Sequence, residues 1–182
     1  MDEKQPVDLL LFKEKAKEHK RGMKRFLSKL ESLPTGKVNV VTVELEKKVW
    51  EEVDCLSCAN CCKTMTPTFT DRDMKRISRH LGESVEDFKK KWLRKERKAD
   101  GDWINRKEPC QFLNLTDNKC SIYEVRPADC AGFPHLGKNM KGYAHVHKQN
   151  LEYCPATYRM VELMVANSNR FFPVAVNRSI SK

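Results

Sequence analysis

Four cysteines lie within eight residues of this 182-residue chain, in the stretch CLSCANCC at positions 55–62. Two thiolates separated by two residues can bind the same cation, because the turn between them directs both sulfurs to one side. The stretch contains two such steps in tandem, so Cys55, Cys58 and Cys61 are predicted to hold one metal ion or cluster from a single loop. Cys62 is predicted to point to a second metal or into the core, because neighbouring side chains diverge.

The other four cysteines lie further along the chain. Cys110, Cys120 and Cys130 follow one another at intervals of ten residues, and Cys154 precedes a proline. In ferredoxin-type sites a distant cysteine followed by proline completes three closely spaced ones, so Cys154 is a candidate fourth ligand. Eight thiols could form two four-thiolate sites, or one site with spare cysteines, and the spacing leaves both partitions open.

Three histidines are further candidate ligands. His135 lies five residues beyond Cys130, and the segment HVH would place His145 and His147 on one face if it were extended. Imidazole suits a mixed site with cysteine, but an isolated histidine is more often a packing or surface residue. The sequence does not decide whether His135, His145 or His147 binds metal.

The compartment affects how the cysteines are interpreted. The chain has no apolar run long enough for a membrane span, and its first twenty residues contain only a four-residue apolar patch between charges. We therefore expect a cytoplasmic protein, in which thiols serve as metal ligands or catalytic groups more often than as disulfides. An even number of cysteines also fits a disulfide framework, which is the less favoured alternative.

A long helix is predicted before the cysteines, over residues 7–33. Apolar residues recur there at alternating spacings of three and four, which is typical of one helix face. The stripe consists of Leu9, Phe12, Ala16, His19, Met23, Phe26, Leu30 and Leu33. We expect it to pack against another helix of the same chain, with His19 bonded to a local partner. Pro34 and Gly36 are predicted to end this helix, and the segment 38–54 could contain a short strand.

Two further helices are predicted after the motif, at about 70–80 and 84–98. Thr70 with Asp73, and Ser84 with Asp87, resemble capping boxes in which Asp replaces the usual Glu. The segment that follows, up to Cys130, mixes β-prone residues with turn formers, so a small β-meander with a hairpin turn at 116–119 is predicted.

Proline positions predict the last helices. Pro127 suits the first turn of a short helix that carries Cys130. Arg126 could bond a carbonyl there or offset thiolate charge, and the equally favoured alternative is a surface arginine beside a turn proline. Pro155 precedes a helix of about three turns. Aromatic residues are expected to form the core and a dry layer around the metal: Trp92, Trp103, Phe112, Tyr123 and Phe133.

Together these elements predict an α+β fold: a small cysteine-rich metal-binding domain with a short β-meander, covering helices and an N-terminal helical extension. The expected organisation is a basic amphipathic helix over 1–40, the cysteine-cluster domain over 41–170 and a C-terminal tail over 171–182, which we expect to be frayed at its end.

The arrangement of cysteines resembles a known family. CLSCANCC, the segments EPCQFL and DNKCSIYEVRPADCAGFP, and the final YCP occur in the order found in the YkgJ-type cysteine-cluster family, the zinc- or iron-chelating CxxCxxCC domain. The resemblance covers about residues 50–160 and implies that all eight cysteines are metal ligands. The glycine that often precedes the CC pair is Asn60 here, which can also adopt left-handed conformations. A flagellin lysine N-methylase carries a similar cluster, and by analogy some members would support methyl transfer with an iron–sulfur centre.

The preferred hypothesis is therefore a metal-binding protein that holds zinc or iron for structure or for metal handling. The alternative is an iron–sulfur protein with a redox or methyl-transfer-related enzymatic role, and the sequence does not decide whether the chain is an enzyme. A formal net charge of +10 would suit an acidic partner for the basic helices, although it also serves solubility. Nucleic acid is the less expected partner, because the chain lacks the aromatic, zinc-finger and helix-turn-helix signatures of such proteins.

Overall fold

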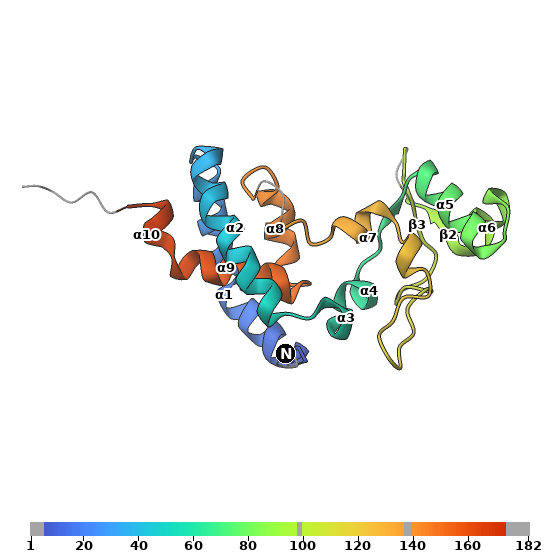
Figure 1. The fold of residues 1–182 in the computed structure, drawn as a ribbon, viewed down its shortest axis with the longest axis horizontal. Helices are drawn as coiled ribbons and strands as arrows, with labels where there is room; N and C mark the ends of the chain where they lie inside the picture. Colours follow the sequence, from blue (N-terminus) through green and yellow to red (C-terminus); the bar gives the residue numbers. More distant parts are fainter. Residues whose placement is uncertain (1–5, 98–99, 137–139, 174–182) are drawn as a thin grey trace, which may run out of the picture. The chain divides into compact units, whose positions relative to one another are not determined.

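The computed structural model describes residues 6–97, 100–136 and 140–173, and it confirms the α+β class. Figure 1 shows the elements in chain order. They are α1 (Leu9–Leu30), α2 (Thr35–Glu52), α3 (Cys55–Cys58), α4 (Asn60–Thr64), β1 (Thr68–Phe69), α5 (Asp71–Leu81), α6 (Val85–Trp92), β2 (Leu93–Lys95), β3 (Trp103–Asn105), η1 (Tyr123–Val125), α7 (Ala128–Gly132), α8 (Ala144–Asn150), α9 (Pro155–Ala166) and α10 (Ser168–Phe171).

The described residues divide into two compact units. The first, which we call the cysteine-rich unit, comprises residues 6–12 and 53–134, and the second, the helical unit, comprises residues 13–52 and 135–173. The domain boundaries predicted at residues 40 and 170 stay a prediction. Most of the predicted C-terminal tail, residues 171–182, lies outside the described residues.

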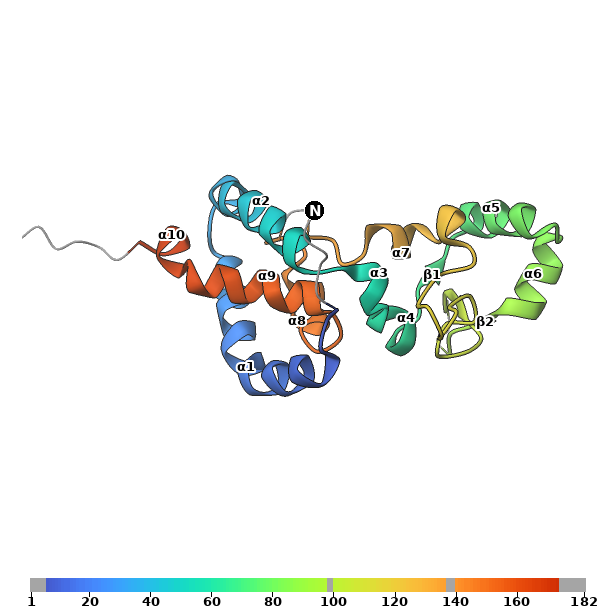
Figure 2. The same ribbon diagram turned by 60° about the horizontal axis from the view of Figure 1, so that its bottom comes forward.

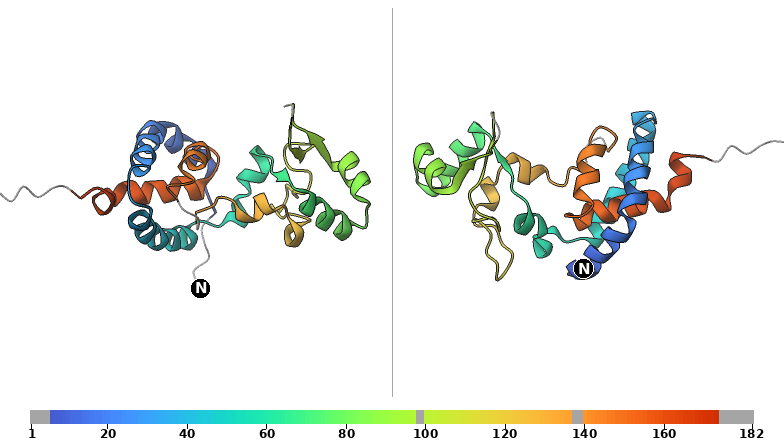
Figure 3. Two further views of the ribbon diagram at one scale, coloured as in Figure 1. Left: turned by 90° about the horizontal axis from the view of Figure 1, so that it is seen from above. Right: turned by 180° about the vertical axis from the view of Figure 1, so that it is seen from behind.

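The helical unit is built around α9. Figure 3 shows α9 between α1 and α2, and the core side chains of α2 that face it, Val38, Val41, Leu45 and Val49, are buried. The predicted stripe of α1 is confirmed, since Ala16, Met23 and Phe26 are buried within the chain. His19 has the expected local partner: its Nδ1 lies 2.7 Å from the hydroxyl of Tyr158.

The short strand suggested for residues 38–54 is wrong, because this segment forms α2. Its valines have high β-propensity, but propensity is a weak preference that packing overrides. Val38, Val41, Leu45 and Val49 recur at helical spacing, and burying them against α9 favours the helix. Gly36 accordingly lies within the first turn of α2, while α1 ends earlier, at Leu30.

In the cysteine-rich unit a three-stranded antiparallel sheet has the order β1-β3-β2, with Thr68 and Arg94 both opposite Ile104. Helices α5 and α6 follow one another beside it (Figure 2). Together they enclose a core of seven buried residues: Phe69, Met74, Ile77, Phe88, Leu93, Phe112 and Ile122. The core lies directly beside the segments that carry the cysteines.

The predicted helix starts are confirmed at Thr70 and Ser84. Thr70 forms a reciprocal capping box with Asp73, and the Ser84 hydroxyl accepts a 3.0 Å bond from the N–H of Asp87. The second helix is shorter than predicted, because the chain turns into β2 at Leu93. Leu93 is fully buried in the core and begins the strand that pairs with β3. This pairing is favoured over a longer helix, because the residues that would extend the helix are charged and would add no apolar burial.

The predicted meander is reduced to β3 and a single bridge between Leu113 and Cys120, which frames the expected turn at 116–119. Asn118 supplies the left-handed conformation in that turn, with φ of 59°. The predicted short helix after Pro127 and the three-turn helix that Pro155 begins are both present, as α7 and α9. Within the described residues, no helix is long and apolar enough to cross a membrane.

Candidate metal centre

The motif CLSCANCC folds into two short helices with one residue between them. Asp54 caps α3, since its carboxylate accepts a 2.9 Å bond from the N–H of Leu56. Ala59 then adopts the left-handed conformation, with φ of 47°, and α4 begins at Asn60. The left-handed residue is thus Ala59 and not Asn60, which is helical and buried. The change of direction at Ala59 separates the first two thiols from the last two.

Backbone N–H groups face three of the sulfurs, each from two residues further along the chain. The donors are Asn60 for Cys58, Phe112 for Cys110 and Ile122 for Cys120. Burial raises the pKa of all three thiols, and these N–H groups oppose that rise because they stabilise the thiolate. The same device stabilises cysteine ligands in metal sites.

Four sulfurs lie close enough to affect one another electrostatically. The pKa of Cys130 is raised first by burial and then by negative charge on Cys62 and Cys110. After burial, the same two thiols raise the pKa of Cys120. Cys62, Cys110, Cys120 and Cys130 therefore form one neighbourhood, which we call the four-thiol group, although they come from three separate segments of the chain.

The predicted divergence of Cys61 and Cys62 is wrong for their sulfur atoms, which lie 4.0 Å apart. Adjacent residues of a helix differ in direction by only about 100°, whereas those of a strand point to opposite faces. Both cysteines belong to α4, so their sulfurs can meet. This contact is the largest cause of the raised pKa of Cys62, and burial is the second.

Backbone hydrogen bonds bring these segments together. The N–H of Cys110 donates to the carbonyl oxygen of Cys62 at 2.8 Å, which fixes the Cys110 loop to α4. The side-chain amide of Asn118 donates to the Ser57 carbonyl at 2.8 Å, so the hairpin turn is held against α3. These bonds explain how cysteines about fifty residues apart become neighbours without an extended sheet.

A second set of bonds positions the segment that carries Cys130. Asp73 accepts from the N–H of Ala128 at 3.1 Å and from Arg76 at 2.7 Å. Arg76 also donates to the carbonyl of Arg126 at 2.8 Å. Helix α5 therefore holds the turn that leads into α7, and Asp73 is at once the N3 residue of the α5 capping box and the anchor of that turn.

Arg126 has both of the roles proposed from the sequence. Its guanidinium donates to the Tyr123 carbonyl at 2.7 Å and lies 3.8 Å from the centre of the Tyr123 ring. Burial raises the pKa of Cys120, and the positive charge of Arg126 is among the influences that oppose the rise. Tyr123 itself is 39% exposed, so its predicted place in the core is wrong.

The rest of the predicted dry layer is largely present. Cys110 and Cys120 pack against the hydrophobic core, in which Phe112 is buried. Trp92 and Trp103 are half-buried against the same core, and Phe133 is half-buried outside it. Apolar contact on one side and N–H donors on the other give these thiols a low-dielectric, hydrogen-bonded setting.

The donor set fits a soft divalent cation. Thiolates are the preferred ligands of zinc and iron, and four of them held near one another repel unless a cation neutralises them. Among the residues that the structure describes, no three Cys, His, Asp or Glu side chains already enclose a point where an ion could sit. Binding would therefore require the four sulfurs of the four-thiol group to draw closer together.

Comparison with known proteins decides the family. The family described as "CxxCxxCC: Putative zinc- or iron-chelating domain" matches residues 54–155, more than half of the chain, including every cysteine. The chain belongs to the CxxCxxCC family. It therefore carries the domain that this family description assigns to zinc or iron chelation.

Relatives add no specific activity. Uncharacterized protein MJ0661 of Methanocaldococcus jannaschii is 31% identical over 81 residues, which are 44% of this chain and 43% of that protein. The chain thus spans less than half of the length of this relative. No solved structure matches the chain.

The CxxCxxCC domain has four cysteines outside the four-thiol group. Cys55 is exposed at the start of α3, Cys58 is buried at its end, and Cys61 is half-buried beside Cys62. Cys154 lies in the helical unit, where its buried sulfur accepts a 3.4 Å bond from the N–H of Thr157 and caps α9. None of the eight cysteines, all of which lie in the described part of the chain, forms a disulfide.

The three candidate histidines lie in the helical unit. The extended arrangement considered for HVH is wrong, because the segment is part of α8, where His145 is exposed and His147 is fully buried. Neither ring nitrogen of His147 has a hydrogen-bond partner among the described residues, and burial lowers its pKa to about 4. His135 has a left-handed backbone, with φ of 65°, and packs its ring against Tyr143.

Sequence reasoning missed one polar residue beside the four-thiol group. Asn105 is only 2% exposed, and its Oδ1 accepts a 3.0 Å bond from Gln111. Its Nδ2 has no partner at hydrogen-bond length among the described residues, but the side chain lies near enough to Cys110 to oppose the effect of burial on that thiol's pKa. No sequence signal marks it, because asparagine is usually a surface residue.

Proposed function

We propose that this protein binds zinc or iron through its cysteines, and that Cys62, Cys110, Cys120 and Cys130 supply one four-thiolate centre. The observation that carries the proposal is the electrostatic coupling among these four thiols, which come from segments far apart in the sequence. Bringing four half-buried thiols together raises their pKa values and costs free energy. Coordination of a cation would reverse that cost, since the thiols would bind as thiolates.

The local structure favours a role for this centre in stability. Between Asn105 and Tyr123 the chain forms no helix or strand, only the Leu113–Cys120 bridge and a few turns. A small unit with so little regular structure gains from cross-links between its segments. When a metal joins such segments, its binding free energy contributes directly to folding.

Cys55, Cys58 and Cys61 are proposed as ligands of a second ion. Their tandem spacing suits a shared cation, and the N–H of Asn60 already faces the sulfur of Cys58. Cys154 is kept as a further candidate ligand because of the cysteine spacing alone. The proposed total is therefore two ions per chain.

Metal analysis of protein purified without oxygen and without an affinity metal tests this function. We expect about two equivalents of zinc or iron, one for each proposed centre. Cys110→Ser should lose one equivalent and Cys55→Ser the other, so each variant is the matched control for the other. Metal-free protein that keeps its wild-type melting curve would contradict the proposal, and loss of all metal in both variants would contradict the two-centre partition.

An iron–sulfur centre with a redox role is the second candidate. N–H groups that face cysteine sulfurs, as seen for Cys58, Cys110 and Cys120, also tune the reduction potentials of such clusters. Visible absorption and acid-labile sulfide in the protein as purified would favour this candidate, whereas colourless protein with stoichiometric zinc would exclude it.

We propose the cytoplasm as the location, because none of the eight described cysteines forms a disulfide and a reducing compartment keeps thiols reduced. Alkylation tests the location. The reagent is added to intact cells together with a denaturant, so that bound metal is released and every thiol can react before extraction. Eight alkylated cysteines are expected, and disulfide-linked peptides would contradict it.

A further inference from the structure

Helix α5 carries a row of cations on the side opposite the core. Arg72, Lys75, Arg76 and Arg79 fall within an arc of about 100° around the helix axis. Met74, Ile77 and Leu81 occupy the opposite side and pack in the core or against it. The row therefore faces outward because of the register of the helix, and not because the whole helix is basic.

Three of the four cations have no acidic partner in the part of the chain that the structure describes. Arg76 is engaged by Asp73 and by the carbonyl of Arg126. Arg72, Lys75 and Arg79 are exposed, and within the described residues none of them forms an ion pair. Asp71 is the one other acidic residue on α5, since the carboxylate of Asp73 is buried and already bonded.

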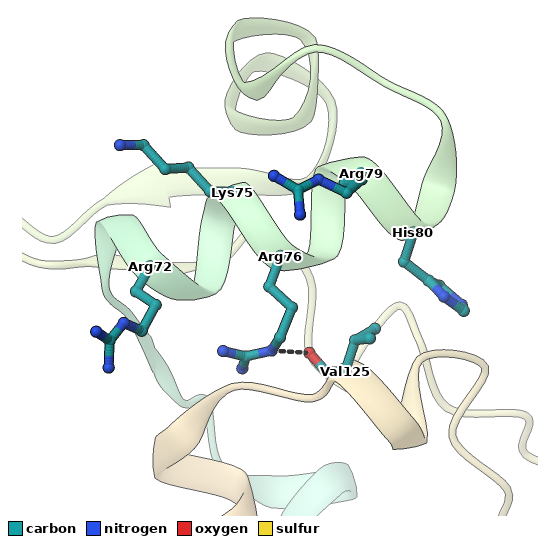
Figure 4. Close-up of a pocket in the computed structure, with 6 residues that line it drawn as sticks. All are labelled: Arg72, Lys75, Arg76, Arg79, His80 and Val125. Atoms are coloured by element: carbon teal, nitrogen blue, oxygen red, sulfur yellow. Dashed lines mark hydrogen bonds between the residues drawn. The ribbon is translucent and has the colours of Figure 1, made fainter.

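These side chains line an open hollow of about 560 Å³ together with His80 and Val125. Figure 4 shows the side chains of Arg72, Lys75, Arg76 and Arg79 projecting from α5, with Arg76 directed to the carbonyl of Val125. Val125 belongs to η1, which packs against α5. The hollow is wide and cationic, so a multiply charged anion suits it better than an apolar ligand.

We propose that this face binds the phosphate chain of single-stranded nucleic acid. Arg72 and Arg79 are seven residues apart, which is about 10 Å along the helix. A single phosphate group cannot bridge that distance. A row of cations of that length matches a series of phosphates, and guanidinium groups pair with phosphate oxygens through two hydrogen bonds. The proposal is independent of metal binding, since none of these residues is a cysteine or a neighbour of one.

The adjacent η1 offers a surface on which an unpaired base can stack. Tyr123 is 39% exposed, and the guanidinium of Arg126 lies 3.8 Å from its ring centre. Aromatic and guanidinium planes beside a cationic groove are the features with which proteins bind single strands without reading their sequence. A duplex keeps its bases paired and stacked, so it would leave this surface unused.

Fluorescence anisotropy with a labelled twelve-nucleotide oligouridylate, at several salt concentrations, tests the proposal on the full metal-loaded chain. The variant Arg72→Gln/Lys75→Gln/Arg79→Gln should bind at least tenfold more weakly at low salt. Its plot of log affinity against log salt should be less steep by about two to three. Lys17→Gln/Arg21→Gln/Arg25→Gln is the matched control, because it removes the same charges from the exposed side of α1 and should change affinity less than threefold.

Two further measurements identify the partner. Tyr123→Leu should weaken oligouridylate binding about fivefold or more, the loss expected for one stacked base, and leave inorganic polyphosphate binding unchanged. Three results would overturn the proposal. The α1 control could lose as much affinity for oligouridylate as the α5 variant, or the α5 variant could bind it as tightly as the wild type. The third is that polyglutamate or polyphosphate binds the wild type as tightly as oligouridylate does. Metal content and melting temperature of the α5 variant and the α1 control should match the wild type, so a failure of binding there does not touch the proposed metal function.

Discussion

The backbone N–H of Cys110 donates a 2.8 Å hydrogen bond to the carbonyl oxygen of Cys62. This bond joins a loop to helix α4 over a sequence separation of 48 residues, and both sulfurs belong to the four-thiol group. It places two candidate ligands side by side through the backbone, without depending on the metal. Metal-free protein should therefore keep part of this arrangement.

Thiol reactivity should distinguish the buried cysteines from the exposed one. Burial and neighbouring negative charge raise the pKa of Cys130, so little reactive thiolate exists at neutral pH. In metal-free protein we expect an alkylating reagent to modify exposed Cys55 before Cys130, as peptide mass spectrometry would show. Uniform modification rates would contradict the burial of the four-thiol group. Adding zinc should protect its members further.

A glycine at position 59 should stabilise the protein. Ala59 is held in the left-handed conformation, which costs a residue with a Cβ about 1 kcal/mol or more, and glycine adopts it freely. Because glycine also gains entropy in the unfolded state, we expect Ala59→Gly to raise the free energy of unfolding by about 0.5 kcal/mol. The control Ala131→Gly, at an exposed helical position, should lower it by up to about 1 kcal/mol. Urea unfolding measures both, and equal effects would contradict the assigned backbone.

Asp73 should be far more important for stability than Asp71, which begins the same helix. Burial raises the pKa of Asp73, but its bonds to Thr70, Arg76 and Ala128 outweigh burial and hold the pKa below its usual value. Asp73→Asn should therefore cost about 2–4 kcal/mol, whereas Asp71→Asn, at an exposed position, should cost less than about 0.5 kcal/mol.

Acid should weaken the contribution of Asp73. Because its pKa is lower in the folded state, the unfolded chain takes up a proton first, and the stabilisation is present above the unfolded pKa of about 4. It is lost as the pH falls through the lower folded value. Unfolding curves at several acidic pH values should therefore be less pH-dependent for Asp73→Asn than for the wild type. An equal pH dependence would show that the carboxylate is not bonded as described.

His147 should make the protein less stable in mild acid. Burial lowers its pKa from 6.5 to about 4, so the unfolded chain binds a proton more readily between these values. Its contribution is complete above about pH 6.5 and is lost as the pH falls, by up to about 1.4 kcal/mol per unit. His147→Leu should flatten this part of the stability profile, and His145→Gln, at an exposed position, should not. Equal profiles for wild type and His147→Leu would contradict the buried neutral imidazole.

Local sequence patterns predicted much of the fold. The stripe of α1, the caps at Thr70 and Ser84 and the prolines at the starts of α7 and α9 act over one or two turns. The residues that cause each element therefore lie within it or directly before it. The failures share a cause. Residues 38–54 have strand-like propensity but pack as a helix, and Leu93 leaves α6 because the core and β3 offer more burial.

The spacing of the cysteines by itself determined the motif, the family resemblance and the expectation of thiolate ligation, because those depend on residue type and order. Only the tertiary structure decided which thiols are neighbours. Cys62 joins Cys110, Cys120 and Cys130 through hydrogen bonds between distant segments, and Cys154 belongs to the other compact unit. The same holds for the cations of α5, whose type is visible in the sequence. Only the fold shows that Asp73 pairs with Arg76, while Arg72, Lys75 and Arg79 form no ion pair within the described residues.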